Sequence, residues 1–350
     1  MLAPVTHILP VARLHRARML PAPGSILVRA GQKVNANDVI GRAMVDYRHL
    51  LVDVQKVLSL KPGTDVDALI ECKVGDVIQK GDVLARRKGV FARYLRSSVQ
   101  GEILSITGGK VLIQTIGTAV DLFAGFPGIV KEVLPERGVI LEVNGALIQG
   151  VWGNGRLDNG VLISILKSPA DELERGQLDI SLRGSIVLAG HCSHPEILQA
   201  AGELGLRGLI LSSCTSNLIQ AASACRFPIL VCEGFGKLPY NPVTYRLVTS
   251  NEKRDVCLNA VAWDSFTGDR PEMVIPLPAE GAVPKETDTF NRDQIVRIQG
   301  HPYTGKVGKL VQVRSEMTLL ENGLRTRTAD VMLEDNQQVL VPLLNLEVIE

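Results

Sequence analysis

The first half of the chain alternates short hydrophobic runs with turns that contain glycine. One phrase occurs twice, as GQKVNANDVIG at residues 31–41 and as GDVIQKGDVL at residues 75–84. Glycine adopts the positive φ that tight turns need, and β-branched residues fill half-buried strands. Each phrase therefore predicts a short strand, a turn, a second short strand and another turn.

The segments around these phrases extend the β pattern, with one exception. Residues 46–60 place leucine and valine at near-helical spacing, so we expect an inserted helix that ends before Pro62. Residues 119–170 return to alternating strands and turns. We therefore assign residues 1–118 to one module that contains the helix, and residues 119–170 to a second β-module.

The periodicity changes in the second half of the chain. Apolar runs at residues 186–190, 208–211 and 227–232 alternate with two amphipathic segments. Strands that alternate with helices of this length indicate a parallel β-α-β-α-β unit. We place this α/β domain at residues 171–262, and we expect a proline-rich linker at residues 263–290.

The repeated phrase also carries a resemblance to a known fold. Residues 17–45 and 70–115 resemble the barrel-sandwich hybrid of biotinyl and lipoyl carrier domains. Those carriers hold their cofactor on a lysine within Met-Lys-Met or Asp-Lys-Ala in an exposed hairpin. The corresponding stretch here reads Arg86-Arg87-Lys88, without either tripeptide. The resemblance therefore implies a compact structural β-module, and we predict no cofactor on it.

The last segment, residues 291–350, resembles the KOW module, an SH3-like barrel of transcription elongation factors and ribosomal proteins. The resemblance rests on Pro302-Tyr303-Thr304-Gly305, on the strand after Val307 and on the closing stretch from Val339 to Val348. It implies binding to RNA, ribosome or polymerase. The segment carries seven basic and eight acidic residues, which make it a weak attractor for phosphate.

These features together predict a multi-domain, mainly β protein with one α/β unit. Its parts are barrel-sandwich-hybrid-like β-modules, a parallel β-α-β-α-β domain and a C-terminal SH3-like barrel. The chain has 350 residues, which is enough for several independent cores.

Composition narrows the functional classes. The chain has 38 Lys and Arg against 37 Asp and Glu, so its overall charge does not favour a nucleic-acid backbone as the main ligand. Six cysteines without a CxxC pair are typical of reduced thiols, and we expect a cytoplasmic protein. No run of about 18 apolar residues is present, so we expect no membrane insertion.

One basic cluster and the KOW-like segment supply candidate contacts to nucleic acid. The cluster lies between residues 86 and 96, beside Phe91 and Tyr94, with no acid among its members. Basic and aromatic side chains together are typical of single-strand binding, whereas a solvated hairpin is the alternative. The candidate residues are Arg86, Arg87, Lys88, Arg93, Arg96, Arg297, Lys306 and Lys309.

The ends of the predicted parallel strands gather polar and soft side chains. Ligands of open parallel sheets bind beyond such strand ends, and imidazole with thiolate suits zinc. The candidate zinc ligands are His191, His194 and Cys214. Three alternatives stay open: a nucleophilic Cys192 or Cys214 with a histidine base, anion binding at the helix N-termini, and simple helix capping.

No established catalytic motif occurs in the chain. GxGxxG does not follow the first strand of the α/β unit, and Walker, HExxH and GxSxG motifs are absent, so we assign no catalytic residue. We predict a non-enzymatic scaffold or adaptor with protein partners in a cytoplasmic assembly. One alternative is a KOW-type protein that binds RNA, the ribosome or the transcription machinery. Another is a metal-binding or thiol enzyme that uses the strand ends at residues 190–233.

Overall fold

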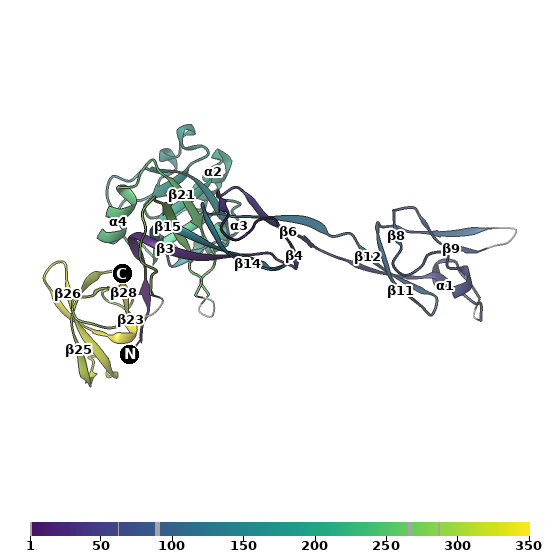
Figure 1. Cartoon of the computed structure of the whole chain (residues 1–350). Coiled ribbons are helices and arrows are strands. Elements are labelled where there is room, and N and C mark those ends of the chain that lie inside the picture. Colours follow the sequence, from purple (N-terminus) through teal and green to yellow (C-terminus); the bar gives the residue numbers. More distant parts are fainter. Residues whose placement is uncertain (1, 62, 88–91, 265–267, 286–287) are drawn as a thin grey trace.

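The computed structural model describes residues 2–61, 63–87, 92–264, 268–285 and 288–350. The protein is mainly β, with several sheets and short helices. In Figure 1 a small β-module lies at one end of the molecule, and a body with a large sheet lies in the middle. A C-terminal β-module, which we call the C-terminal barrel after the fold expected from the sequence, lies at the other end. Within the described residues, no helix has the length and apolar character needed to cross a bilayer.

The module at the far end, which we call the distal module, comprises residues 49–115. Its elements are β7 (His49–Asp53), α1 (Val54–Val57), η1 (Asp67–Leu69), β8 (Val77–Ile78), β9 (Val83–Arg87), β10 (Arg93–Arg96), β11 (Gly101–Thr107) and β12 (Lys110–Thr115). Four of these strands form a sheet in the order β7-β12-β11-β8, and β9 pairs with β10 in a hairpin. Leu84, Ile103 and Ile113 are fully buried, so the distal module has a hydrophobic core of its own.

A second module, which we call the proximal module, joins the distal module to the body. It comprises residues 15–45 and 118–142. Its strands are the end of β3 (Ile8–Met19), β4 (Gly24–Ile26), β5 (Lys33–Val34), β6 (Val39–Val45), β13 (Thr118–Phe123), β14 (Gly128–Leu134) and the start of β15 (Gly138–Gln149). Thr118 lies opposite Val45 in the β6–β13 pair, so the chain leaves and re-enters the proximal module at one point. The whole distal module is therefore inserted at the end of the β6–β13 hairpin.

The proximal and distal modules have the same strand pairing. β5 pairs with β14 as β8 pairs with β11, and β6 pairs with β13 as β9 pairs with β10. β3 pairs with β15 as β7 pairs with β12. All six pairs are antiparallel. One arrangement of strands therefore occurs twice, with one copy inside the other.

The correspondence extends to single residues. A bulge interrupts β14–β15 between Val130 and Glu132, and the equivalent bulge interrupts β11–β12 between Ile103 and Ser105. The backbone N–H of Gly31 donates to the Val130 carbonyl over 2.7 Å, and that of Gly75 donates to the Ile103 carbonyl over 2.8 Å. Bulges are specific features of a strand pair, so a bulge at the same place supports a true structural repeat.

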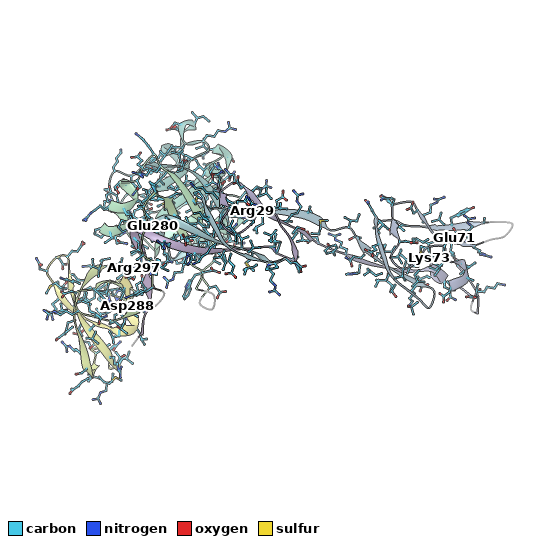
Figure 2. The ribbon with its side chains drawn as sticks, viewed as in Figure 1. Arg29, Glu71, Lys73, Glu280, Asp288 and Arg297 are labelled. Carbon is cyan, nitrogen blue, oxygen red and sulfur yellow. The ribbon has the colours of Figure 1, made fainter. Side chains whose placement is uncertain are left out.

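The repeated sequence phrase forms the same turn in both modules. The carboxylates of Asp38, Asp76 and Asp82 each accept a hydrogen bond of 2.7 Å from the backbone N–H three residues earlier. Aspartate closes such turns because its short side chain mimics a backbone carbonyl. Arg29 and Lys73 each lie two residues before the start of a phrase, and Figure 2 shows Arg29 beside the body and Lys73 in the distal module.

Two expectations for this half of the chain are wrong. The predicted helix at residues 46–60 is mostly not helical, because His49–Asp53 forms strand β7 and only Val54–Val57 forms a helix. A short apolar run fits either period, and pairing with β12 selects the strand. The boundary predicted between residues 1–118 and 119–170 falls inside β13, because the proximal module is discontinuous in sequence.

The body is built on an eleven-stranded sheet in the order β16-β20-β19-β18-β17-β21-β22-β15-β14-β5, with β3 also paired to β15. Its remaining strands are β16 (Trp152–Gly153), β17 (Leu157–Ser164), β18 (Ile186–Ala189), β19 (Gly208–Cys214), β20 (Ile229–Phe235), β21 (Asp255–Asn259) and β22 (Glu272–Pro276). Its helices are α2 (Pro195–Leu204), α3 (Ile219–Ala224) and α4 (Pro242–Thr249), with 3-10 turns η2 (Arg175–Gln177), η3 (Ile180–Leu182) and η4 (Ser216–Leu218).

Strands β18, β19 and β20 are parallel, and helices α2 and α3 connect them. Residues of α2 and α3 pack on one face of these strands, and residues of α4 pack on the opposite face. The expected linker at residues 263–290 is in part wrong, because it contains β22, a buried strand between β21 and β15. The apolar run Met273–Ile275 explains this, because it gives a central strand its buried side chains.

The C-terminal barrel comprises residues 288–350 and the start of the chain. Its elements are β1 (Leu2–Ala3), β2 (Val5–Thr6), β23 (Asp288–Thr289), β24 (Ile295–Ile298), β25 (Val307–Leu319), β26 (Arg325–Leu333), β27 (Gln338–Pro342), η5 (Leu343–Asn345) and β28 (Leu346–Ile349). Strand β2 pairs in parallel with β28, so the first residues belong to this barrel and not to the module predicted at residues 1–118. Val296, Leu310 and Val331 are fully buried at its centre.

Candidate interaction surfaces

The β9–β10 hairpin of the distal module, which we call the distal hairpin, gathers four arginines around one tyrosine. Tyr94 lies opposite Arg86 in the register, and Arg93 lies opposite Arg87. The Arg86 and Arg96 guanidinium carbons lie 5.2 and 5.7 Å from the centroid of the Tyr94 ring. Tyr94 is 49% exposed. The hairpin therefore presents an accessible aromatic ring between cationic groups, which is the geometry of a cation–π contact.

Carboxylates neutralise little of this charge. Arg86 forms an ion pair of 3.2 Å with Glu71, and both side chains are partly exposed. The Arg96 guanidinium donates to the Gly81 carbonyl over 2.8 Å. Among the described residues no carboxylate forms an ion pair with Arg87 or Arg93. Lys88, the fifth basic residue predicted here, lies outside the described residues.

The equivalent hairpin of the proximal module has a different surface. Arg42 and Asp121 lie opposite each other, and the Arg42 Nε donates to the Asp121 carboxylate over 2.6 Å. This hydrogen bond lowers the pKa of Asp121. The positions equivalent to Arg87, Arg93 and Arg96 hold Ala43, Val120 and Phe123. The same pair of strands thus carries one neutralised arginine in one module and four arginines in the other.

The structure does not unite the basic residues predicted in the barrel with those of the distal hairpin. The barrel and the distal module lie at opposite ends of the molecule (Figure 1). Lys306 and Lys309 are partly exposed, and they form ion pairs with Asp335 at 3.7 Å and Asp293 at 2.9 Å. These pairs neutralise both lysines locally.

Arg297 was expected as a surface contact, and that expectation is wrong. Its side chain is 3% exposed and forms ion pairs with Glu233, at 2.7 Å, and with Glu347. The backbone and side-chain amides of Asn241 also donate to Glu233, over 3.0 and 2.8 Å. Burial alone would lower the pKa of Arg297, but the two carboxylates outweigh it and raise that pKa.

Glu233 belongs to β20 of the body and Arg297 to β24 of the barrel, so this buried cluster joins the two parts. Figure 2 shows Arg297 where the barrel meets the body. A buried charge without its partner costs several kcal/mol, about 3–5, and this penalty opposes separation of the barrel from the body. Sequence reasoning missed this contact because its members are far apart in the chain.

The predicted zinc ligands His191, His194 and Cys214 do not converge. His191 is buried, and its Nδ1 lies 2.9 Å from the Ser213 hydroxyl. His194 is mostly exposed beside Glu196, with 3.7 Å between Nδ1 and Oε1. Across the described parts of the chain, no three His, Cys, Asp or Glu residues are placed to hold a metal ion. The zinc prediction is therefore wrong for this set.

The thiol alternative is also unfavourable in this environment. Burial raises the pKa of Cys192 to about 11 and that of Cys214 to about 12. Burial also lowers the pKa of His191. The thiolate is the nucleophile, and these thiols stay protonated at neutral pH. The Cys192 and Cys214 side chains belong to the core beneath α2 and α3, so they serve packing.

A hollow of about 500 Å³ lies beside these strand ends. Its lining is Glu172, Leu173, Glu174, Arg175, His194, Glu196 and Ile197. Glu172 accepts hydrogen bonds from Ser193 at 2.7 Å and from Lys237 at 2.9 Å. Glu196 lies beside His194. Glu172, the carboxylate with two hydrogen-bond donors, is therefore already held by other side chains of the body.

The barrel exposes large apolar side chains on one hairpin that the sequence analysis did not single out, with Arg325 and Arg327 on the opposite strand. Met317, Leu319 and Leu324 lie near the end of the β25–β26 hairpin and are 50%, 69% and 54% exposed. We call these three residues the barrel tip. A hollow of about 210 Å³ on the same barrel is lined by Phe290, Val313, Arg314, Ser315, Arg327 and Leu343. Grouped exposed apolar side chains are typical of protein contacts. The signal was present as apolar residues on both sides of the turn at Asn322-Gly323.

No protein-family model matches this chain, and no curated protein matches it either.

Proposed function

We propose that the protein is a non-enzymatic adaptor that holds two partners at its two ends. The observation that carries this proposal is the position of the distal hairpin and the barrel tip at opposite ends of one elongated molecule (Figure 1). The buried Glu233–Arg297–Glu347 cluster supports it further, because it fixes the barrel to the body. An adaptor needs such fixed geometry between its binding surfaces, and several modules in series supply it.

The module folds belong to the same proposal. The two matching antiparallel modules support a barrel-sandwich-hybrid-like fold for each. The meander β24 to β27, followed by a 3-10 turn and β28, supports a KOW or SH3-like barrel. The cysteines are free thiols, which supports a reducing compartment such as the cytoplasm. The alternative function, RNA binding, is supported by the distal hairpin and not by the KOW-like barrel. The two barrel lysines, Lys306 and Lys309, form ion pairs with aspartates.

Removal of one end at a time tests the adaptor. The first variant lacks residues 46–117 and joins Val45 to Thr118 through an Asn-Gly turn, which suits two paired antiparallel strands. The second variant keeps the barrel core and changes only its exposed tip, as Met317→Ser, Leu319→Ser and Leu324→Ser. Tagged full-length protein and both variants are cross-linked in cells of origin, purified and compared by mass spectrometry.

We expect each variant to lose one set of cross-linked partners and to keep the set of the other end. Thermal unfolding with the wild-type midpoint in the barrel-tip variant excludes a general loss of fold. Identical partner sets for the full chain and both variants would contradict the proposal, and so would loss of all partners on removal of a single end.

A further inference from the structure

The repeat supplies an internal control for the distal hairpin. The proximal module builds the same hairpin with the same register, yet it has one arginine, Arg42, neutralised by Asp121. The distal module replaces that acid with Tyr94 and adds three arginines. The fold of the module therefore does not need the basic cluster. The basic cluster occurs in only one of the two copies, and the fold does not require it. Its presence therefore points to a ligand that binds the distal module.

The cluster also carries an energetic cost. Arg87 lies directly opposite Arg93 in the β9–β10 pair. Like charges directly opposite each other destabilise an antiparallel pair. The described part of the chain offers neither residue a carboxylate partner. An anionic ligand removes this repulsion, so bound anion and folded hairpin stabilise each other.

The charge distribution favours approach of an anion at this end. Residues 46–117 hold eleven Lys and Arg and eight Asp and Glu, whereas the rest of the chain holds 27 basic and 29 acidic residues. The distal module is therefore positive and the remainder slightly negative. A charged ligand is oriented by such a separation of charge before it makes contact.

Tyr94 decides between classes of anion. An acidic peptide would use the guanidinium groups but would leave the ring without a role. A single nucleic-acid strand uses both, because its phosphates accept from arginine and its bases stack on aromatic rings. The ring of Tyr94 is half exposed and lies within 5.2 and 5.7 Å of two guanidinium carbons. A base that stacks on Tyr94 takes the place of one of these guanidinium groups, which is then free to donate to a phosphate.

We propose that the distal hairpin binds single-stranded nucleic acid, with Arg86, Arg87, Arg93 and Arg96 on the phosphates and Tyr94 stacked on a base. This inference rests on the adaptor proposal, since it names the ligand class at one of the two ends. The barrel tip, with its three exposed apolar side chains, then holds the protein partner. The resulting adaptor joins a nucleic acid to a protein.

Fluorescence anisotropy of the full-length chain tests the binding. The probes are fluorescein-labelled oligouridylate and oligothymidylate of about 12 nucleotides, a length within the range that single-strand binding sites cover. Four phosphate contacts predict that affinity falls about 50-fold between about 50 mM and about 200 mM salt. A labelled duplex and labelled polyglutamate of similar charge represent two other classes of anion. The proposal requires that the single strands bind more tightly than the duplex and more tightly than polyglutamate.

The proximal module supplies the substitutions for the hairpin. Arg87→Ala with Arg93→Val installs the residues of the proximal hairpin, removes two contacts, and should reduce the salt effect to about sevenfold. Tyr94→Asp installs the proximal acid opposite Arg86 and should weaken binding at least about tenfold, through lost stacking and the added negative charge. Arg42→Ala is the matched control in the proximal module, and it should leave binding unchanged.

The outcomes separate the two proposals. Absence of single-strand binding, tighter binding of the duplex or of polyglutamate, or unchanged binding by Tyr94→Asp would each overturn the nucleic-acid inference. The adaptor proposal still holds after any of these results if the barrel-tip variant and the distal-module variant lose different partners. Unfolding midpoints equal to wild type in the hairpin variants exclude loss of fold as the cause of weaker binding.

Discussion

The proximal and distal modules share one backbone plan but have different surroundings. The core of the proximal module includes Ile40 and continues into the body through β15, where it meets Leu147 and Val274. The core of the distal module includes Leu84 and contains only residues of that module. Ile40 and Leu84 occupy equivalent places in the repeat. The same strands therefore form part of the body in one module and an independent unit in the other.

The two copies of the module use the same hairpin for different purposes. The hairpin of the proximal module ends in an attachment point, because β6 and β13 carry the inserted distal module. The hairpin of the distal module ends beside four arginines and an exposed tyrosine. The proximal module thus carries the distal module, and the distal module presents the basic surface. The residues that differ lie on β9 and β10 outside the buried core, and surface positions tolerate such change because the buried side chains define the fold.

The largest expected effect comes from the two equivalent core residues. Ile40→Ala and Leu84→Ala each remove a fully buried side chain, and each should cost about 2–5 kcal/mol of local stability. Hydrogen exchange measures which amides lose protection. Leu84→Ala should affect residues 49–115 alone, whereas Ile40→Ala should also affect β14, β15 and β22, because these share its core.

Loss of protection in the body after Leu84→Ala would show that the two modules unfold as one unit. The matched control is Leu51→Ala, at a residue 59% exposed on β7, which should change protection little.

A smaller effect is expected at two equivalent glycines. A Cβ on Gly101 would meet the Gln114 carbonyl oxygen, and a Cβ on Gly128 would meet the Glu142 carbonyl oxygen. Each Gly→Ala substitution should therefore cost about 1–3 kcal/mol, through backbone displacement. Chemical denaturation monitored by hydrogen exchange measures the loss of stability caused by each substitution. A neutral effect at one glycine and a large effect at the other would limit the structural equivalence of the modules. Gly31→Ala does not match this test, because its φ of 81° adds strain of a different kind.

The smallest expected effect concerns pH. The hydrogen bond from Arg42 lowers the pKa of Asp121 below the unfolded value of about 3.9. A lowered carboxylate pKa contributes stability above that unfolded value, and the contribution is lost as pH falls through the folded pKa. Wild-type protein should therefore lose slightly more stability than Asp121→Asn between about pH 6 and about pH 3. The pair is exposed to solvent, so the difference is small and should shrink further in salt.

Tyr94→Asp extends the pH comparison to the distal module. The substitution creates an acid opposite Arg86 and should give the distal module the same acid-dependent loss that Asp121 gives the proximal one. Amide exchange of β9 and β10 at both pH values is the measurement. A distal module whose protection does not depend on pH in this variant would show that the two hairpins place equivalent side chains differently.

Local sequence pattern predicted the turns and many strands. The phrases at residues 31–41 and 75–84 form the expected turns, because glycine and aspartate determine a turn within a few residues. The apolar runs of the α/β unit likewise form strands β18, β19 and β20. The pattern failed at residues 46–60, where a short apolar run suited both helix and strand and only the pairing with β12 decided.

The candidate sites show the same limit. Arg86, Arg87, Arg93 and Arg96 lie together because they are near in sequence and share a hairpin. His191, His194 and Cys214 were expected to meet on the assumption that polar side chains at strand ends converge. One histidine turned inward to Ser213 and the other outward beside Glu196. Side-chain direction at the end of a strand depends on packing, which the sequence pattern does not contain.

The sequence by itself therefore determined the turns, the apolar strands, the charge of the distal hairpin and the recurrence of one phrase. Tertiary structure alone decided that one copy is inserted into the other, that Val5–Thr6 joins the barrel, and that Arg297 is buried between Glu233 and Glu347. The physical reason is the distance along the chain over which each interaction acts. Turn chemistry and hydrophobic periodicity act over a few residues, whereas strand partners and buried ion pairs depend on contacts between residues far apart in the chain.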